Sequence, residues 1–470
     1  MTVRPTAPSA WRTDARLADV TCRPFWADTA PPGPPCPPLG SDAACDLAII
    51  GGGFTGLWTA IAARRRSPGA RILLLEAALC GGAASGRNGG FCAPSISHGV
   101  GNALRRWPRE AATLIRLGRD NLEGFLRDHE TLELDAGLTR AGKINLAEKP
   151  WQVAGLRAME ANYRRFGIEC SFLEGAALRA HFDSPVYPAG LFEPNYALVD
   201  PGRLVAGLRR VALAMGVEIH ERTPVAGLRH DRAGGAVILE TAGGRVAAGR
   251  AVLATNAAPP LLRRLAPAVI PIHDYALVTR PLATEELAAA GWTGGHGAAD
   301  SGNRFHYMRK TACNRILWGG YDAVYHYGSR QGGALLDSAQ SYCRLAANFA
   351  RALPALAHVP FTHAWGGVID TSARTTFFAG RACDGRLAYA MGFTGQGVTA
   401  SRFAAHAMLD LLDGTETERT RLAMLRRRPF PFPPDPLRRL ALRLTQRDLA
   451  RADGTGHRPA LPRGLDALGM

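Results

Sequence analysis

The chain has 470 residues, of which 47% are hydrophobic and 20% charged, so it is long enough for two globular domains and is not generally disordered. Its formal net charge is +16, which taken alone would suggest a nucleic-acid or membrane surface. Only three lysines occur, however, and the arginines are spread along a glycine- and proline-rich chain, which is typical of GC-rich coding bias. We therefore expect no nucleic-acid partner, while attraction of an acidic substrate or partner stays open as the alternative.

The nine cysteines include no C-x-x-C pair, so neither a zinc site nor a disulfide framework is expected, and no metal site is predicted. Reduced thiols fit a cytoplasmic location. The N-terminus lacks the basic and apolar pattern of a signal peptide, and no apolar run approaches the length of a membrane span. The sequence thus predicts a cytoplasmic protein without a membrane span.

A nucleotide site is predicted near the start of the chain. An apolar run at 47–50 indicates a buried parallel strand, and Gly51, Gly53 and Gly56 follow it at the point where a helix begins. These glycines permit a tight turn, the approach of a diphosphate, and close packing of helix on strand. Glu76 ends the next strand about twenty residues later, where a carboxylate can accept both hydroxyls of an adenosine ribose. The pattern predicts dinucleotide binding, with NAD and FAD both open.

The rest of the chain alternates between helical and strand patterns, with no internal repeat. We expect an extended, proline-rich arm before the nucleotide site and a basic, proline-rich tail that wraps the outside. Between them the clearest helix follows Asp200, a plausible N-cap, with Pro201 in its first position. The segment "RFHYMRKTACNRILWGGYD" predicts two strands around a turn, and "RLAYAMGFTGQGVTASRFAAHAMLDLLDG" predicts a strand, a glycine turn and a helix.

A second glycine-rich stretch, "GGAASGRNGGF" at 81–91, helps to decide between NAD and FAD as the cofactor. It places Arg87 and Asn88 in almost bare backbone. An NAD fingerprint does not call for such a loop. A flavin does, because glycines let the chain run close to a flat ring and a diphosphate while Arg87 and Asn88 supply hydrogen-bond donors. The stretch therefore favours FAD over NAD or a surface turn.

Five segments together extend this interpretation: "DLAIIGGGFTGLWTA", "ASGRNGGF", "VDPGRL" leading to "TPV", "AVLATNAAP" and "GFTGQGVTAS". Over residues 42–414 their order and spacing resemble those of the FAD enzymes of the D-amino-acid oxidase, glycine oxidase and sarcosine oxidase superfamily. The closest subgroup resembles the γ-glutamylputrescine oxidoreductase-like enzymes, for which S-G-R-N-G-G is distinctive.

The resemblance implies an α/β fold, with a Rossmann-type, glutathione-reductase-like FAD-binding domain and an α+β substrate domain built on a mixed or antiparallel sheet. The expected division is as follows: arm, 1–41; FAD-binding domain, 42–130, 200–260 and 365–414; substrate domain, 131–199 and 261–364; tail, 415–470.

The resemblance also implies which residues hold FAD. Those at the diphosphate and the adenosine ribose are Gly51, Gly53, Phe54, Thr55, Gly56, Glu76 and Ala77. Those beside the diphosphate and the flavin ring are Ala84, Ser85, Arg87, Asn88, Gly89 and Gly90. Val225 would meet the adenine, Ala254 and Thr255 would form a strand-end turn, and Gly392, Thr394, Gly395, Gln396, Gly397 and Val398 would lie at the pyrimidine side.

Backbone N–H groups of that last turn would stabilise the negative charge of a reduced flavin. Covalent attachment is not expected, because 365–367 carries no cysteine and 81–91 no histidine.

The implied reaction transfers a hydride from the carbon next to an amine nitrogen to flavin N5, which leaves an imine. Water then hydrolyses the imine to a carbonyl and an amine. The substrate would be an amine or amino acid, such as a γ-glutamylated or N-substituted amine. Thr399 stands where sarcosine oxidases carry a lysine that helps oxygen to react, so O2 and another electron acceptor both stay open. The candidates for the substrate pocket are His273, Tyr275, His306, Tyr307, Arg309 and Trp365, for each of which sheet packing is an equal explanation.

Two alternatives remain. One is a flavin enzyme of specialised metabolism that acts on an unusual amino acid or a modified peptide. The other is a non-catalytic flavoprotein that binds nucleic acid or an acidic protein, which basic residues clustered on one face would favour. The sequence does not predict an oligomeric state.

Overall fold

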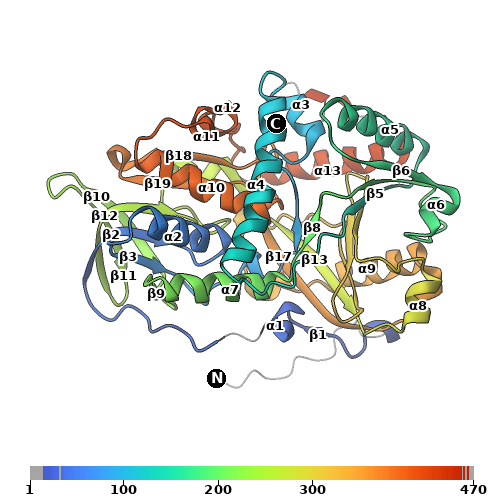
Figure 1. Ribbon diagram of the computed structural model, residues 1–470, viewed down its shortest axis with the longest axis horizontal. Coiled ribbons are helices and arrows are strands. Elements are labelled where there is room, and N and C mark those ends of the chain that lie inside the picture. The colour runs from blue at the N-terminus through green and yellow to red at the C-terminus, as the bar shows by residue number, and fades with distance from the viewer. Residues whose placement is uncertain (1–13, 31–32, 458, 461–462, 465–470) are drawn as a thin grey trace.

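The computed structural model describes residues 14–30, 33–457, 459–460 and 463–464. Two large β-sheets, one of eight strands and one of nine, lie side by side with helices packed around them (Figure 1). The predicted α/β fold, with a parallel nucleotide-binding sheet and a second mixed sheet, is confirmed.

The eight-stranded sheet has the order β10-β11-β12-β2-β3-β9, and β19 joins it beside β12. Its pairs β12–β2, β2–β3, β3–β9 and β12–β19 are parallel. The strands are β2 (Ala43–Ile50), β3 (Ile72–Leu75), β9 (Glu218–His220), β10 (Val225–Asp231), β11 (Ala236–Thr241), β12 (Gly244–Leu253), β18 (Phe378–Ala382) and β19 (Leu387–Met391).

This sheet is buried on both faces, as is typical of parallel sheets. Ile49 and Leu74 point to the helices α2 (Phe54–Arg66), α7 (Pro201–Ala214) and α10 (Gly397–Leu412). The alternate residues, such as Ile50 and Leu75, belong to a separate core with β11 and β12. The turn between β2 and α2 is therefore held between two packed layers.

The nine-stranded sheet has the order β1-β17-β13-β16-β15-β14-β5-β7-β6. Its strands are β1 (Thr21–Cys22), β5 (Lys143–Ala147), β6 (Ser171–Glu174), β7 (Ala189–Glu193), β13 (Val269–Thr279), β14 (Gly297–Asp300), β15 (His306–Lys310), β16 (Ile316–Gly320) and β17 (Phe361–Ser372). The antiparallel pair β15–β16 confirms the predicted two strands around a turn. Helix α9 (Ala339–Ala352) covers one face through contacts such as that of Phe349 with Trp318.

The remaining elements surround these sheets. They are the helices α1 (Trp26–Thr29), α3 (Val100–Arg106), α4 (Ala111–Thr131), α5 (Pro150–Arg165), α6 (Gly175–Arg179), α8 (Thr284–Ala289), α11 (Glu418–Arg421), α12 (Ala423–Arg426) and α13 (Leu437–Thr455), and the short strands β4 (Phe91–Cys92) and β8 (Ala197–Leu198).

The N-terminal arm differs from expectation. Residues 1–13 and 31–32 lie outside the described part, but the segment between them is not irregular, because β1 pairs in parallel with β17 at the edge of the nine-stranded sheet. Trp26 of α1 is 2% exposed, and its Nε1 donates to the carbonyl of Asn88 at 2.8 Å. This segment contains one proline and is fixed by buried aromatic side chains, whereas the proline-rich residues 33–41 form no helix or strand.

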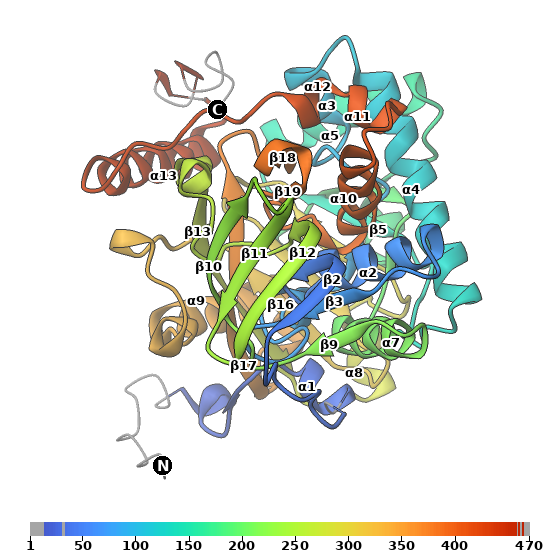
Figure 2. The ribbon, with the colours of Figure 1, turned by 90° about the vertical axis from the view of Figure 1, so that its left-hand side faces the viewer.

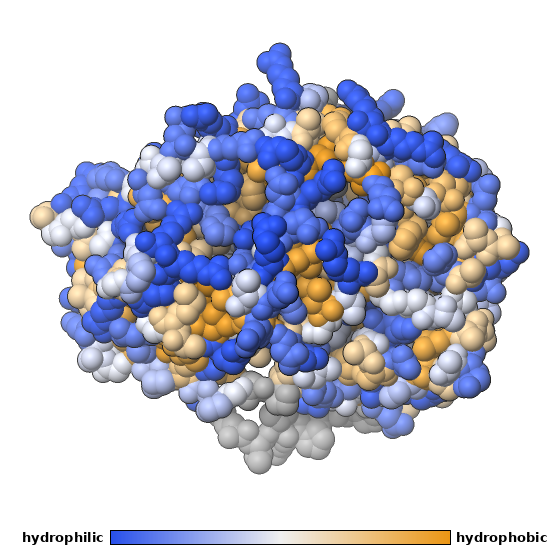
Figure 3. Space-filling view, viewed as in Figure 1, coloured by the Kyte–Doolittle hydropathy of each residue, from blue (hydrophilic) through white to orange (hydrophobic). Residues whose placement is uncertain are grey.

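The C-terminal tail also forms more structure than its prolines suggested. Arg374, buried and without an assigned role in the sequence, donates to the carbonyls of Met424 and Arg427 and so anchors α12. The long helix α13 follows and projects at the left-hand side in Figure 2. Hydrophilic side chains separate small apolar areas on the face shown in Figure 3. Within the described ranges, no helix combines the length and apolar character needed to cross a bilayer.

Candidate functional site

The turn between β2 and α2 has no room for side chains at its first and last glycines. Gly51 has a φ of +108°, and a Cβ there would lie 2.5 Å from the carbonyl oxygen of Ala254. A Cβ on Gly56 would lie 1.8 Å from the carbonyl oxygen of Gly51. The turn is therefore bare backbone, as close approach of a diphosphate requires.

The start of α2 supplies hydrogen-bond donors to this turn. The N–H groups of Phe54, Thr55 and Gly56 have no acceptor within the helix, because they belong to its first turn. Phe54 N donates to Ser85 Oγ at 2.9 Å, and a Cβ on Gly53 would lie 2.9 Å from the same oxygen. The second glycine-rich loop thus lies directly against the turn and leaves Thr55 and Gly56 to face an anion.

Glu76 is fixed beside the same turn. One carboxylate oxygen accepts from Gly52 N at 2.6 Å and the other from Ala78 N at 2.9 Å. Each oxygen keeps a lone pair for a ribose hydroxyl. The backbone of Glu76 also accepts from Thr223 N, which brings the start of β10 at Val225 to this end of the sheet.

The loop Ala84–Gly90 is held by side chains from three distant parts of the chain. Trp26 donates to the Asn88 carbonyl, Trp365 donates to the Arg87 carbonyl at 2.9 Å, and Arg309 donates to the Gly89 carbonyl at 3.2 Å. The Asn88 side chain closes the loop on itself, because its amide donates to the Ser85 carbonyl and its oxygen accepts from Gly90 N. Arg309 and Trp365, predicted as pocket residues, therefore position this loop.

Arg87 links the loop to the nine-stranded sheet. Its Nε donates to the Gly82 carbonyl at 3.1 Å and its Nη1 to the Gly366 carbonyl at 3.0 Å. Burial lowers the pKa of its guanidinium. Among the described residues, no carboxylate forms an ion pair with it, so its charge suits an anionic cofactor.

The glycine turn before α10 is organised by Asp370, which no sequence pattern singled out. The Asp370 carboxylate accepts from Gly392 N at 2.5 Å and from Phe393 N at 3.1 Å. With its nitrogen facing the carboxylate, the amide of Asn256 donates to both oxygens. Burial raises the pKa of Asp370 to about 7. The carboxylate thus ties the strand-end turn after β12 to the turn that opens α10.

The first turn of α10 presents further backbone donors. The N–H groups of Gly397, Val398 and Thr399 have no acceptor within the helix. The Thr399 side chain is fully buried and donates to the Ala93 carbonyl at 2.8 Å, so this helix start meets the chain just after β4. Such a helix N-terminus stabilises negative charge on a ring placed against it.

The alternation of β15 separates the predicted pocket residues. Tyr307 and Arg309 face the Ala84–Gly90 loop, whereas His306 lies on the opposite face. His306 is held there by Asp300 at 2.8 Å and by Asn348 of α9 at 3.0 Å. The structure does not bring His306 together with Tyr307 and Arg309, because successive side chains of a strand point to opposite faces.

Two further candidates also lie away from the loop. The Tyr275 ring packs against Tyr342 of α9, and its hydroxyl donates to the Leu335 carbonyl at 2.9 Å. The His273 ring is buried against His326, with ring centroids 4.6 Å apart. Sheet packing accounts for both.

Asp274 is the second carboxylate that the sequence analysis missed. It accepts a hydrogen bond from the Tyr307 hydroxyl at 2.8 Å on the loop side of the sheet. Burial raises its pKa to about 7, and the hydrogen bond from Tyr307 acts in the opposite direction. A charged residue inside the apolar run "IPIHDYALVT" was the signal available for it.

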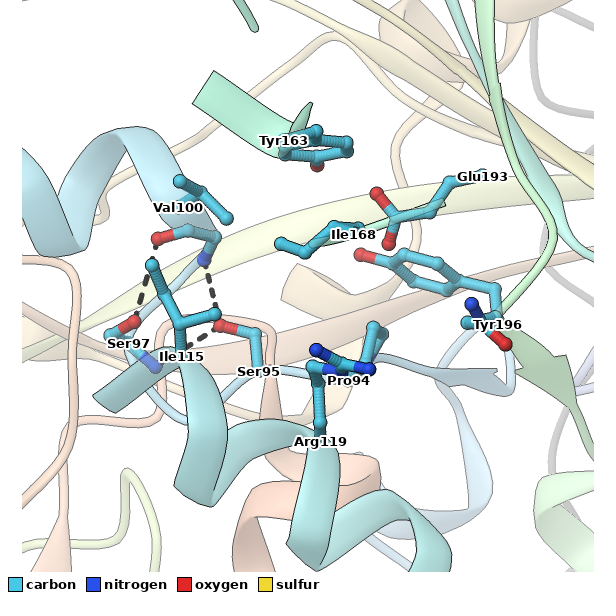
Figure 4. A pocket seen from close by; sticks show the side chains of 12 residues that line it. Pro94, Ser95, Ser97, Val100, Ile115, Arg119, Tyr163, Ile168, Glu193 and Tyr196 are labelled. Atoms are coloured by element: carbon cyan, nitrogen blue, oxygen red, sulfur yellow. Dashed lines mark hydrogen bonds between the residues drawn. The ribbon is translucent and has the colours of Figure 1, made fainter. Parts of the chain in front are cut away.

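A pocket lies just beyond β4, lined by residues of α3, α4 and α5 and by the end of β7 (Figure 4). Pro94 and Ser95 line one side, and Tyr163, Glu193 and Tyr196 line the other. The enclosed space is about 30 Å³, enough for about two water-sized groups. In Figure 4 the Glu193 carboxylate and the Tyr196 hydroxyl point into the same space. Nothing in the sequence pattern singled out these residues.

Glu193 is the chemically distinctive group of this pocket. It is 3% exposed, and its Oε2 has no hydrogen-bond partner among the described residues. Burial raises its pKa, while Tyr163 and the neighbouring Lys143 act to lower it. Lys143 pairs with Glu193 across β5 and β7, and its Nζ lies 5.3 Å from the centre of the Tyr196 ring. A buried carboxylate with a free oxygen is suited to a cationic group.

The comparisons agree with this geometry. The family model for DAO, FAD dependent oxidoreductase, matches residues 46–411, and the chain belongs to that family. It is 28% identical over 420 residues to the probable oxidoreductase OrdL of Rhizobium meliloti, covering 87% of this chain and 92% of the relative. It is 27% identical over 414 residues to the γ-glutamylputrescine oxidoreductase of Escherichia coli, with the same two coverages.

Among solved structures, the fold is similar to that of glycine oxidase from Geobacillus kaustophilus. The TM-score is 0.68 at 21% identity, over 80% of this chain and 96% of that chain. The protein is thus an FAD-dependent oxidoreductase. The two bare glycine turns, the two helix N-termini and the carboxylate of Glu76 fit the diphosphate, ring and ribose of FAD.

We expect Asp370→Ala to loosen the turn before α10. The substitution leaves the buried N–H groups of Gly392 and Phe393 without their acceptor, which should lower the free energy of unfolding by about 2–5 kcal/mol. Urea unfolding of the FAD-loaded protein, together with its FAD content, measures this. Asp120→Ala is the control, because that side chain is 59% exposed. Equal losses in the two variants would contradict the role of Asp370.

We expect Asp274→Asn to change how stability depends on pH. The pKa of Asp274 is about 7 in the folded protein against 3.8 when exposed, so the wild type loses stability as the pH rises between these values. Asparagine can still accept from Tyr307 but does not titrate. The variant should become the more stable protein towards pH 7.5, by at most about 4 kcal/mol. Urea unfolding between pH 4.5 and 7.5 tests this, and parallel curves would disprove it.

Proposed function

We propose that this enzyme oxidises the C–N bond of a secondary or N-substituted amine, such as a γ-glutamylated amine, to an imine that water hydrolyses to a carbonyl compound and an amine. The bound FAD would supply the two-electron acceptor for this step. The observation that carries the proposal is the pocket beyond β4, which Glu193 lines with a carboxylate oxygen that has no hydrogen-bond partner among the described residues.

The residues of this chain would each have a limited role. The Ala84–Gly90 loop would present a rigid backbone to the cofactor, because its carbonyls are already bonded to Trp26, Trp365 and Arg309. Glu193 would bind the ammonium group at one end of the substrate, because the space beside it, lined by Tyr163 and Tyr196, admits only about two water-sized groups. The pocket begins one residue after Ala93, whose carbonyl contacts the start of α10 at Thr399. This continuity supports a substrate site next to the flavin.

The relative from Escherichia coli is named for γ-glutamylputrescine, which supports a substrate with a free or acylated amine. The second substrate would be O2 or another electron acceptor. Thr399 is fully buried and bonded to Ala93, so it offers no cation to assist oxygen. We therefore propose slow reoxidation by air compared with reduction by the substrate.

An anaerobic panel of amines and amino acids tests the reaction. We expect a secondary or γ-glutamylated amine to bleach the oxidised flavin absorbance and to yield a carbonyl product. Subsequent exposure to air then separates an oxidase from a dehydrogenase. Bleaching only by hydroxy acids, or by no member of the panel in a protein that retains FAD, would contradict the proposal.

Glu193→Gln tests the pocket. We expect KM for the oxidised amine to rise by about tenfold with little change in kcat, because a neutral amide no longer pairs with the ammonium group. FAD content should be unchanged. Glu174→Gln, at a side chain 64% exposed, is the matched control. An unchanged KM in the Glu193 variant would place the ammonium group elsewhere.

A further inference from the structure

The helix α13 carries an apolar row on its outer side. Leu437, Leu440 and Leu444 follow each other at helical spacing and are 60%, 56% and 45% exposed. Tyr327, 46% exposed, lies against the same helix through a contact of its ring with Arg439. Soluble proteins rarely gather large apolar side chains in this way without a partner for them.

A row of arginines runs beside these leucines. The exposed residues of this row, spaced by four along the helix, are Arg439, Arg443, Arg447 and Arg451. Arg451 lies 3.9 Å from Asp448, whereas Arg443 and Arg447 have no acidic partner among the described residues. Together with the three leucines, these four arginines form what we call the α13 outer face.

The inner side of α13 is firmly attached to the nine-stranded sheet unit. Asp453 accepts from Asn303 and Arg304, and Gln446 donates to the Ala323 carbonyl. Trp151 donates to the Asp453 carbonyl at 3.4 Å. These contacts hold the helix in place, and Figure 2 shows it projecting at the edge of the molecule opposite α4. Its outer face is presented in a fixed orientation.

We propose that the α13 outer face docks this enzyme on an anionic lipid surface. The leucines would enter the boundary between headgroups and acyl chains, and the arginines would contact the anionic headgroups, as in amphipathic helices that lie in the membrane interface. A second copy of the chain fits this face less well, because pairing two such helices would bring their arginine rows together. The net charge of +16 also favours attraction of the protein to an anionic surface.

Sedimentation with vesicles tests this proposal on the FAD-loaded protein. The probes are vesicles of phosphatidylcholine alone and vesicles with about one-third phosphatidylglycerol. We expect binding only to the anionic vesicles, and weaker binding as salt is raised. Leu440→Ser with Leu444→Ser, and Arg443→Ser with Arg447→Ser, should each weaken binding by about tenfold or more. FAD content and stability should not change, because these side chains are exposed.

The charge-matched control is Arg232→Ser with Arg421→Ser, whose side chains are 80% and 64% exposed and lie away from α13. Its binding should match the wild type. Equal loss in this control would show attraction by net charge alone and would overturn the proposal. The absence of vesicle binding would also overturn the proposal. So would a wild-type dimer that the leucine variant fails to form, or a protein that binds polyglutamate but not vesicles.

Discussion

The structure depends on how the carbonyl groups of the Ala84–Gly90 loop are satisfied. A glycine-rich loop has little intrinsic preference for one conformation, and its bare backbone polar groups need partners when buried. Here the partners are the indole N–H groups of Trp26 and Trp365 and the guanidinium of Arg309. They come from the N-terminal segment and from two strands of the nine-stranded sheet. The nine-stranded sheet and the arm must therefore be in place before the loop has one shape.

Buried carboxylates perform a related task elsewhere in the site. Asp370 gathers two backbone N–H groups and the Asn256 amide, and Asp274 receives the Tyr307 hydroxyl. Each carboxylate is costly to bury, as the pKa near 7 of both groups shows, but Asp370 fixes the turn before α10 and Asp274 holds Tyr307 beside the Ala84–Gly90 loop. Stability and a preorganised cofactor site are thus coupled through the same side chains.

Local patterns predicted one part of this site well and the other part poorly. The strand, glycine turn, helix and acid at Gly51–Glu76 lie within a short stretch, where spacing alone determines geometry. The pocket candidates came from two strands, and their side chains divide between two faces of the sheet. His306 and Tyr275 face α9, while Tyr307 and Arg309 face the loop. Without strand register, the residue types gave no way to choose between the faces.

The sequence by itself determined the cofactor class, the family and the presence of two glycine turns, because these depend on short motifs and on the order of those motifs along the chain. Only the tertiary structure decided that Arg309 and Trp365 hold a loop, that Asp370 supports a turn, and that Glu193 faces a pocket. It also decided that α13 exposes leucines beside arginines. Contacts between residues far apart in the chain, and the burial they create, set the role of each of these side chains, and no local pattern records them.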